Sequence, residues 1–123
     1  MKRIIATPDA PAAIGPYSQA VETNGILFVS GQLPVNPVTG EIPSGIEAQT
    51  RQSLENIMAI LKQAGLGPDN VAKTCVLRQH ISDSAAMNAV YAEFFPADKP
   101  ARVCYEVAAL PKGALVEIDA IAG

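Results

Sequence analysis

The sequence predicts a two-layer α+β domain, in which two helices cover one face of a mixed β-sheet. Strand-like stretches of apolar residues occur at 17–30, 71–81 and 102–122. Two stretches between them, 46–64 and 83–95, repeat apolar residues every three or four positions, as amphipathic helices do. Two helices cover only one face of such a sheet, so the other face needs a different cover.

Composition narrows the class of protein. A chain of 123 residues, 49% of them hydrophobic, is expected to form a single domain over 1–123. The net charge of −3, with both signs intermixed, argues against nucleic acid or an anionic membrane as partner. The sequence has no run of eighteen apolar residues, so no transmembrane helix is expected, and the apolar stretch in residues 1–8 is shorter than a signal peptide requires. Two cysteines, Cys75 and Cys104, are typical of reduced thiols in the cytoplasm, and one histidine predicts no metal site.

Local signals place the elements before residue 100. Residues 2–6 are predicted as a short edge strand, and Asn24-Gly25 is predicted to turn a hairpin between 17–22 and 26–30. The helix over 46–64 is expected to begin at the N-cap Ser44 and to end at Gly65. The second helix is expected to be capped by Ser82 or Asp83 and to run to about residue 95.

The C-terminal stretch is predicted as two strands, 102–108 and 114–122, joined by a turn at 111–113. Alternation assigns Val103, Tyr105 and Val107 to the core face of the first strand, and Val116, Ile118 and Ala120 to that of the second. Arg102 and Glu117 would then share the other face of adjacent strands. That face also carries Cys104, Leu115 and Ile121, so we expect identical subunits to bury it.

Arg102 and Glu117 are the candidates for chemistry. An arginine fork matches a carboxylate in a bidentate way, although composition alone favours a structural ion pair of Arg102 with Glu106 or Glu117. A half-buried Glu117 would have a raised pKa and could exchange protons with water; the alternative is a salt bridge between subunits. Cys104 has apolar neighbours, which argues against a nucleophilic thiolate, and the single His80 is more typical of a structural or surface residue.

The C-terminal motif Pro-Ala-Arg-x-Cys-x-Glu-Val-Ala-x-Leu-Pro-x-x-Ala-x-Val-Glu-Ile, from Pro100 to Ile118, resembles the signature of the RidA (YjgF) family of enamine/imine deaminases. The run Ile14–Ala20 and the segment Ser30-Gly31-Gln32 match further family motifs, so the resemblance covers nearly the whole chain. It implies a chorismate-mutase-like fold and a homotrimer with active sites in the clefts between subunits. It also implies hydrolysis of 2-imino acids, such as 2-iminobutanoate and 2-iminopropanoate, to 2-keto acids and ammonia without a cofactor.

The resemblance also implies a role for each site residue. Arg102 would bind the carboxylate of the imino acid, and Glu117 would orient or activate the hydrolytic water. Ser30 and Gly31 would bind substrate, with the Gly31 backbone close to the ligand, and Cys104 would act through its main chain. Tyr17 would line the pocket, although a packing aromatic is the plainer interpretation of that residue alone.

Three positions depart from the family pattern. His80 and Ser84 stand where many members have Asp and Phe, and Val103 stands where serine is frequent. These departures bear on pocket shape and substrate range. Two other functions stay open. One is a non-catalytic small-molecule-binding or regulatory module, and the other is an endoribonuclease, which the net negative charge and the single histidine argue against.

Overall fold

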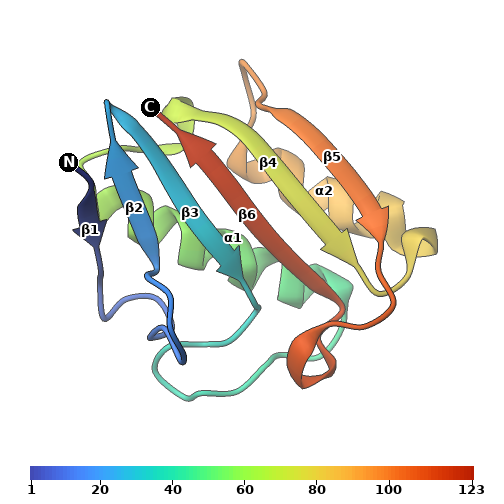
Figure 1. The fold of residues 1–123 in the computed structure, drawn as a ribbon. Coiled ribbons are helices and arrows are strands. Elements are labelled where there is room, and N and C mark those ends of the chain that lie inside the picture. The colour runs from blue at the N-terminus through green and yellow to red at the C-terminus, as the bar shows by residue number, and fades with distance from the viewer.

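The structure, a computed structural model, describes the backbone of residues 1–123 and every side chain except that of Asp83. Six strands form one mixed sheet in the order β1-β2-β3-β6-β4-β5, and both helices lie behind it (Figure 1). The two-layer α+β prediction is therefore confirmed. Neither of these described helices has the length and apolar character that crossing a bilayer requires. The elements are β1 (Arg3–Ile5), β2 (Ala20–Thr23), β3 (Ile26–Gln32), α1 (Ile46–Gln63), β4 (Val71–Arg78), α2 (Ser84–Phe94), β5 (Ala101–Glu106) and β6 (Val116–Ala122).

The predicted hairpin at Asn24-Gly25 joins β2 to β3. Thr23 pairs with Ile26, so the loop has two residues. Both have positive φ, 50° at Asn24 and 77° at Gly25, as a type I′ turn requires. This turn matches the twist of the strands and fixes the register of β3, which later supplies one wall of the cavity.

Helix α1 packs its apolar stripe on the sheet and ends as predicted. Leu54, Ile57 and Leu61 are fully buried. At its end, Leu66 N donates to Leu61 O and Gly65, with φ of 78°, donates to Lys62 O. These two bonds form a Schellman motif, for which glycine is the favoured residue.

The predicted start of α1 needs correction. The N-cap of α1 is Gly45, whose φ of 91° suits glycine, and no side chain caps it, so the assignment to Ser44 was wrong. Helix α2 begins at Ser84, after a 3₁₀ turn over Ile81–Asp83. The side chain of Asp83, one of the two predicted caps, lies outside the described part of the chain.

The prediction of a C-terminal hairpin is wrong. Strand β4 lies between β5 and β6, parallel to β5 and antiparallel to β6. The faces of β5 are also reversed. Val103 and Tyr105, expected in the core, are 37% and 52% exposed, whereas Arg102 and Cys104 face the helices. Val116, Ile118 and Ala120 of β6 are buried as predicted. Arg102 and Glu117 therefore lie on opposite faces of the sheet.

The face without helices carries an apolar row that crosses four of its strands. Pairing aligns Ile4, Val21, Phe28 and Ile121 in one row from β1 to β6, and Phe28 is 45% exposed. Exposed apolar side chains that form a continuous surface mark an interaction site in most proteins. The prediction of an uncovered face with apolar side chains thus holds in part for the single chain: Ile121 lies on it and Val103 and Tyr105 are added, but Cys104 packs against the core instead.

Arg78 is the largest fully buried side chain, at the end of β4 and on the helix side. Its Nε, Nη1 and Nη2 have no hydrogen-bond partner among the described residues. Glu106 lies beside it on β5, but the Glu106 carboxylate accepts from Ile81 N instead, at 3.0 Å. Burying a guanidinium without a partner opposes folding, because the ion loses its hydration.

We expect Arg78→Met to raise the free energy of unfolding by about 1–4 kcal/mol, since methionine fills a similar space without a charge to desolvate. Urea denaturation measures the change. Arg51→Met is the control, because Arg51 is exposed and its 2.9 Å contact with Glu93 lies in solvent, so its loss should change stability little. A clear loss of stability in Arg78→Met would mean that the guanidinium is paired in solution.

Candidate functional site

The larger of two described cavities, about 740 Å³, lies at the end of β3 where the open sheet face meets two loops. It brings together four of the predicted site residues: Tyr17, Ser30, Gly31 and Glu117. The remaining wall is mostly apolar. It comprises Pro11, Ala12, Ile14, Leu33, Val35, Pro37 and Pro111, with Gln32, Asn36 and Lys112 among the polar members.

A β-bulge places Gly31 directly beneath the Glu117 carboxyl group. Val29 pairs with Ala120 and Gln32 with Ile118, so Ser30 and Gly31 together face a single residue of β6. A methyl group on Gly31 would lie 3.0 Å from Glu117 Cδ and 3.2 Å from Oε1. Any side chain at position 31 would displace the Glu117 carboxyl group, so glycine is required there. Bulges of this kind are common beside active sites.

The environment of Glu117 raises its pKa. Burial is the larger cause, because a half-buried carboxylate loses hydration, and the charge of Asp119 is the second. Asp119 lies two residues along β6, on the same face. Its own pKa is raised by burial and lowered by nearby Lys73. The cavity thus holds a carboxyl group poised to exchange a proton closer to neutral pH than an ordinary glutamate.

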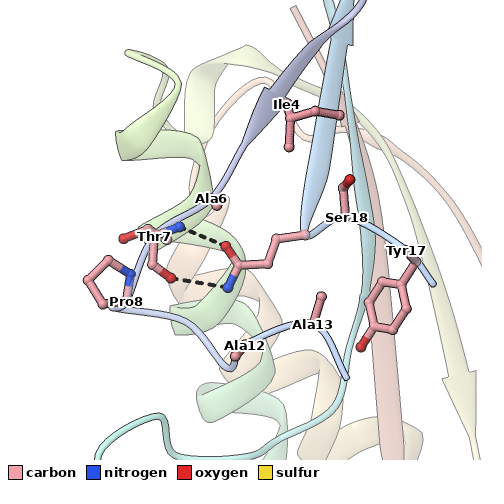
Figure 2. A pocket seen from close by; sticks show the side chains of 9 residues that line it. Ile4, Ala6, Thr7, Pro8, Ala12, Ala13, Tyr17 and Ser18 are labelled. Atoms are coloured by element: carbon pink, nitrogen blue, oxygen red, sulfur yellow. Dashed lines mark hydrogen bonds between the residues drawn. The ribbon is translucent and has the colours of Figure 1, made fainter. Parts of the chain in front are cut away.

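Tyr17 stands between the larger cavity and a smaller one of about 410 Å³ (Figure 2). Its hydroxyl accepts from Ile14 N at 3.4 Å. The buried Gln19 ties together the loop between β1 and β2. Its Oε1 accepts from Thr7 N at 2.7 Å, and its Nε2 donates to Thr7 O and Pro11 O. The Thr7–Gln19 bonds are the dashed lines in Figure 2. This network fixes the loop that carries Tyr17.

Ser30 has a structural bond that also serves the site. Its Oγ donates to Ser18 O at 2.6 Å, and its N–H donates to Gln19 O. Both bonds tie the end of β3 to the loop before β2. Ser30 therefore holds the two sides of the cavity together, while the Gly31 backbone stays exposed.

Arg102 lies outside this cavity, on the edge strand β5. Its Nη1 donates to Asn88 Oδ1 at 2.8 Å, and its Cζ lies 4.8 Å from the centroid of the Tyr91 ring. The alternative of an ion pair with Glu106 or Glu117 is contradicted. Glu106 binds Ile81 N, Glu117 lies on the other face, and the salt bridges among the described side chains are Arg3–Glu22 and Arg51–Glu93.

Cys104 and His80 lie outside the cavity as well. The Cys104 side chain is partly buried and packs against the hydrophobic core, and it does not line the larger cavity. Cys104 and Cys75 are both free thiols. His80 is exposed before the 3₁₀ turn, and it does not line the cavity.

Sequence reasoning missed three features of the site. Asn88 and Tyr91, which contact Arg102, lie three residues apart on one face of α2, and that spacing was the available signal. Asp119, whose charge contributes to the raised pKa of Glu117, is the third residue. Its position two residues from Glu117 in a strand was the available signal.

Comparisons with known proteins agree with this geometry. The family model described as endoribonuclease L-PSP matches residues 7–123. The chain is 54% identical to a RutC family protein of Pasteurella multocida, covering 99% of this chain and 98% of that one. It is 50% identical to the 2-iminobutanoate/2-iminopropanoate deaminase of Escherichia coli, with the same coverage.

Solved structures give the same result. The Rid family protein YyfA of Yersinia pestis superposes with a TM-score of 0.97 at 53% identity, over 100% of this chain and 99% of that one. E. coli TdcF with bound serine superposes with a TM-score of 0.95 at 47% identity, over 98% of this chain and 97% of that one. The fold is thus the chorismate-mutase-like one that the sequence resemblance predicted. The chain belongs to the endoribonuclease L-PSP family, which is the RidA (YjgF) family indicated by its sequence motifs.

Proposed function

We propose that this protein hydrolyses 2-imino acids, such as 2-iminobutanoate and 2-iminopropanoate, to 2-keto acids and ammonia. The observation that carries the proposal is the half-buried Glu117 carboxyl group in the larger cavity, with its raised pKa. A carboxylate in such surroundings is a better base than an ordinary one. The E. coli relative named as a deaminase of these two compounds supports the choice of substrate.

Glu117 supplies the proton transfers that imine hydrolysis requires. Water attacks the carbon of the C=N bond, its oxygen bonds to that carbon, and the π electrons move to nitrogen. Glu117 takes a proton from the water and passes it to the nitrogen, which gives a carbinolamine. The carbinolamine hydroxyl then releases its proton through Glu117 to the nitrogen, the C–N bond breaks, and ammonia leaves the keto acid.

Arg102 is proposed to hold the substrate carboxylate, with its fork on the carboxylate oxygens. Because it lies on the opposite sheet face from Glu117 of the same chain, we propose that β5 of a second copy brings Arg102 to the cavity. The sheet ends at β5, so Arg102 is exposed at an edge. The main chain of Cys104 lies on the same edge strand and would hold substrate or water there.

A homotrimer is the proposed assembly. Contact through the open sheet face would remove its apolar side chains from water, Phe28 and Tyr105 among them, which favours association. Tyr17, Ser30 and Gly31 would then form one wall of each site and β5 of the neighbour the other. The two free thiols and the proposed metabolic substrate favour the cytoplasm as the location.

Serine bound to E. coli TdcF is a small amino acid with an α-carboxylate, as the proposed substrate has. This likeness favours a small-molecule site over a nucleic-acid site. An endoribonuclease is less well supported, because His80 lies outside the cavity and the net charge is −3. A binding module without turnover would need Arg102 but no base, so the placement of Glu117 favours the enzyme.

Replacing Glu117 with glutamine tests the proposed base. Glu117→Gln keeps the size and hydrogen bonding of the side chain but cannot take a proton, so kcat should fall ~10²-fold or more. Turnover is measured with threonine dehydratase as the imine source and semicarbazide as the competing trap. Calorimetry should show that 2-ketobutyrate still binds. Normal turnover in Glu117→Gln would refute the mechanism. A wild-type protein that binds 2-ketobutyrate but turns over no imino acid would instead support the alternative of a non-catalytic binding module.

The pH dependence of kcat/KM should reveal the raised pKa of Glu117 in the free protein. Activity needs the carboxylate, so it should decline as pH falls through that pKa, with a midpoint above the ordinary glutamate value of about 4.3. Asp119→Asn removes a negative neighbour and should move the midpoint to lower pH. An unchanged midpoint in Asp119→Asn would show that the two carboxyl groups do not interact.

Gly31→Ala should lower kcat about 10-fold or more without unfolding the protein. The added methyl group would lie 3.0 Å from Glu117 Cδ, and the flexible glutamate side chain would move aside, away from the water it orients. Kinetics and thermal denaturation measure the two effects. Gly67→Ala is the control, because Gly67 has φ of −143° and nothing lies within 4 Å of its added carbon. Equal activity in both variants would contradict the described position of Glu117.

Mixing two inactive variants tests whether each site takes residues from two chains. Arg102→Gln and Glu117→Gln proteins are denatured together, refolded and assayed. If neighbouring copies share a site, random trimers should regain roughly a quarter of the wild-type activity, since each site needs one intact residue from each neighbour. Separately refolded proteins, mixed afterwards, are the control. No recovery in co-refolded trimers would place both residues in one chain.

A further inference from the structure

Two residues of α2 contact the Arg102 guanidinium one helical turn apart. Asn88 Oδ1 accepts from Nη1 at 2.8 Å, and the Tyr91 ring lies beneath Cζ, with 4.8 Å between Cζ and the ring centroid. Residues three apart share a helix face, so both contacts come from the same side. A long side chain on an exposed edge strand is thereby bound at two points instead of moving freely in water.

Both contacts leave the positive charge uncompensated. An amide oxygen and an aromatic face are neutral, and among the described side chains no carboxylate pairs with Arg102. A carboxylate partner would have to be displaced before an anionic ligand could bind. A guanidinium held by neutral groups keeps its charge available, while its orientation is already restricted.

The Tyr91 ring is itself fixed by β4. Tyr91 is buried, and its hydroxyl lies 2.7 Å from the hydroxyl of the fully buried Thr74. Thr74 is also the residue that pairs with Arg102 in the parallel ladder of β4 and β5. Three contacts therefore link Thr74, Tyr91 and Arg102. The Thr74 hydroxyl holds the Tyr91 ring in place, the ring supports the Arg102 guanidinium, and the pairing of β4 with β5 fixes Arg102 beside Thr74.

We propose that Tyr91, anchored by Thr74, is a positioning residue that presents the Arg102 guanidinium to the substrate carboxylate. The proposal rests on the proposed function in one respect, the role of Arg102. Without the ring, Arg102 would adopt many rotamers, and the ligand would have to order it on binding. The ring acts equally before and during the chemical step, so its loss should appear in KM and not in kcat.

Tyr91→Leu and Phe95→Leu form a matched pair. Both remove a buried aromatic ring near the same end of the core, and the two rings are neighbours, with centroids 4.9 Å apart, but only Tyr91 contacts Arg102. We expect KM for 2-iminobutanoate to rise about 3- to 30-fold in Tyr91→Leu, with kcat nearly unchanged. Phe95→Leu should lose stability without a change in KM. Equal KM values in the two variants would overturn the proposal.

NMR of the ligand-free protein tests the positioning without turnover. The Tyr91 ring current should shift the Arg102 side-chain protons upfield; the shift should persist in Phe95→Leu and vanish in Tyr91→Leu. If the wild type lacks the shift, Tyr91 does not hold Arg102, whatever the enzyme does. If the wild type shows the shift but no turnover, the proposed function fails while positioning can still be tested. Calorimetry with 2-ketobutyrate then measures ligand affinity, and an unchanged affinity in Tyr91→Leu would refute the positioning role.

Thr74→Val covers the case in which Tyr91→Leu does not fold. Valine keeps the shape of threonine and removes only the hydroxyl that anchors the ring. KM should rise in the same direction by a smaller factor, with a reduced ring-current shift of Arg102. An unchanged KM together with an unchanged shift would show that the ring needs no anchor from β4, and would refute the proposal as stated.

Discussion

The insertion of β4 between β5 and β6 decides where each functional side chain lies. Because β4 runs parallel to β5 and antiparallel to β6, the two C-terminal strands never pair, although only a short segment joins them. The register of β4 sets Thr74 beside Arg102 and Leu77 beside Glu117. Thr74 faces the helices and Leu77 faces away, so one strand separates the two candidate residues onto opposite faces of the sheet.

Local signals in the sequence predicted those parts of the fold that local chemistry controls. Asn24-Gly25 specifies its turn by backbone conformation, and the spacing of Leu54, Ile57 and Leu61 specifies a helix face. The pairing of β4 depends on contacts between residues far apart in the chain, which no local pattern encodes. The start of α1 was misplaced because serine is the commoner N-cap, whereas the chain enters this helix through the positive φ of Gly45.

The error on β5 has a specific physical cause. Alternation shows which residues share a face, but not which face is covered, and here both faces carry apolar side chains. Val103 and Tyr105 are apolar side chains of the open face, and in the sequence they cannot be distinguished from core residues. The site residues themselves came from family motifs. Their division between a cavity and an edge strand depends on the sheet order and became visible only in the structure.

Glu117 and Asp119, side by side on β6, also couple folding to protons. Burial raises the pKa of each carboxyl group above the value it has in an unfolded chain. Between the unfolded and folded pKa values, the folded chain therefore holds more protons than the unfolded chain, and folding takes protons up from solution. The contribution of these two groups to stability grows as pH falls through that interval and is least favourable above it. This trend is opposite to that of a salt-bridged carboxylate, whose stabilising contribution is lost in acid.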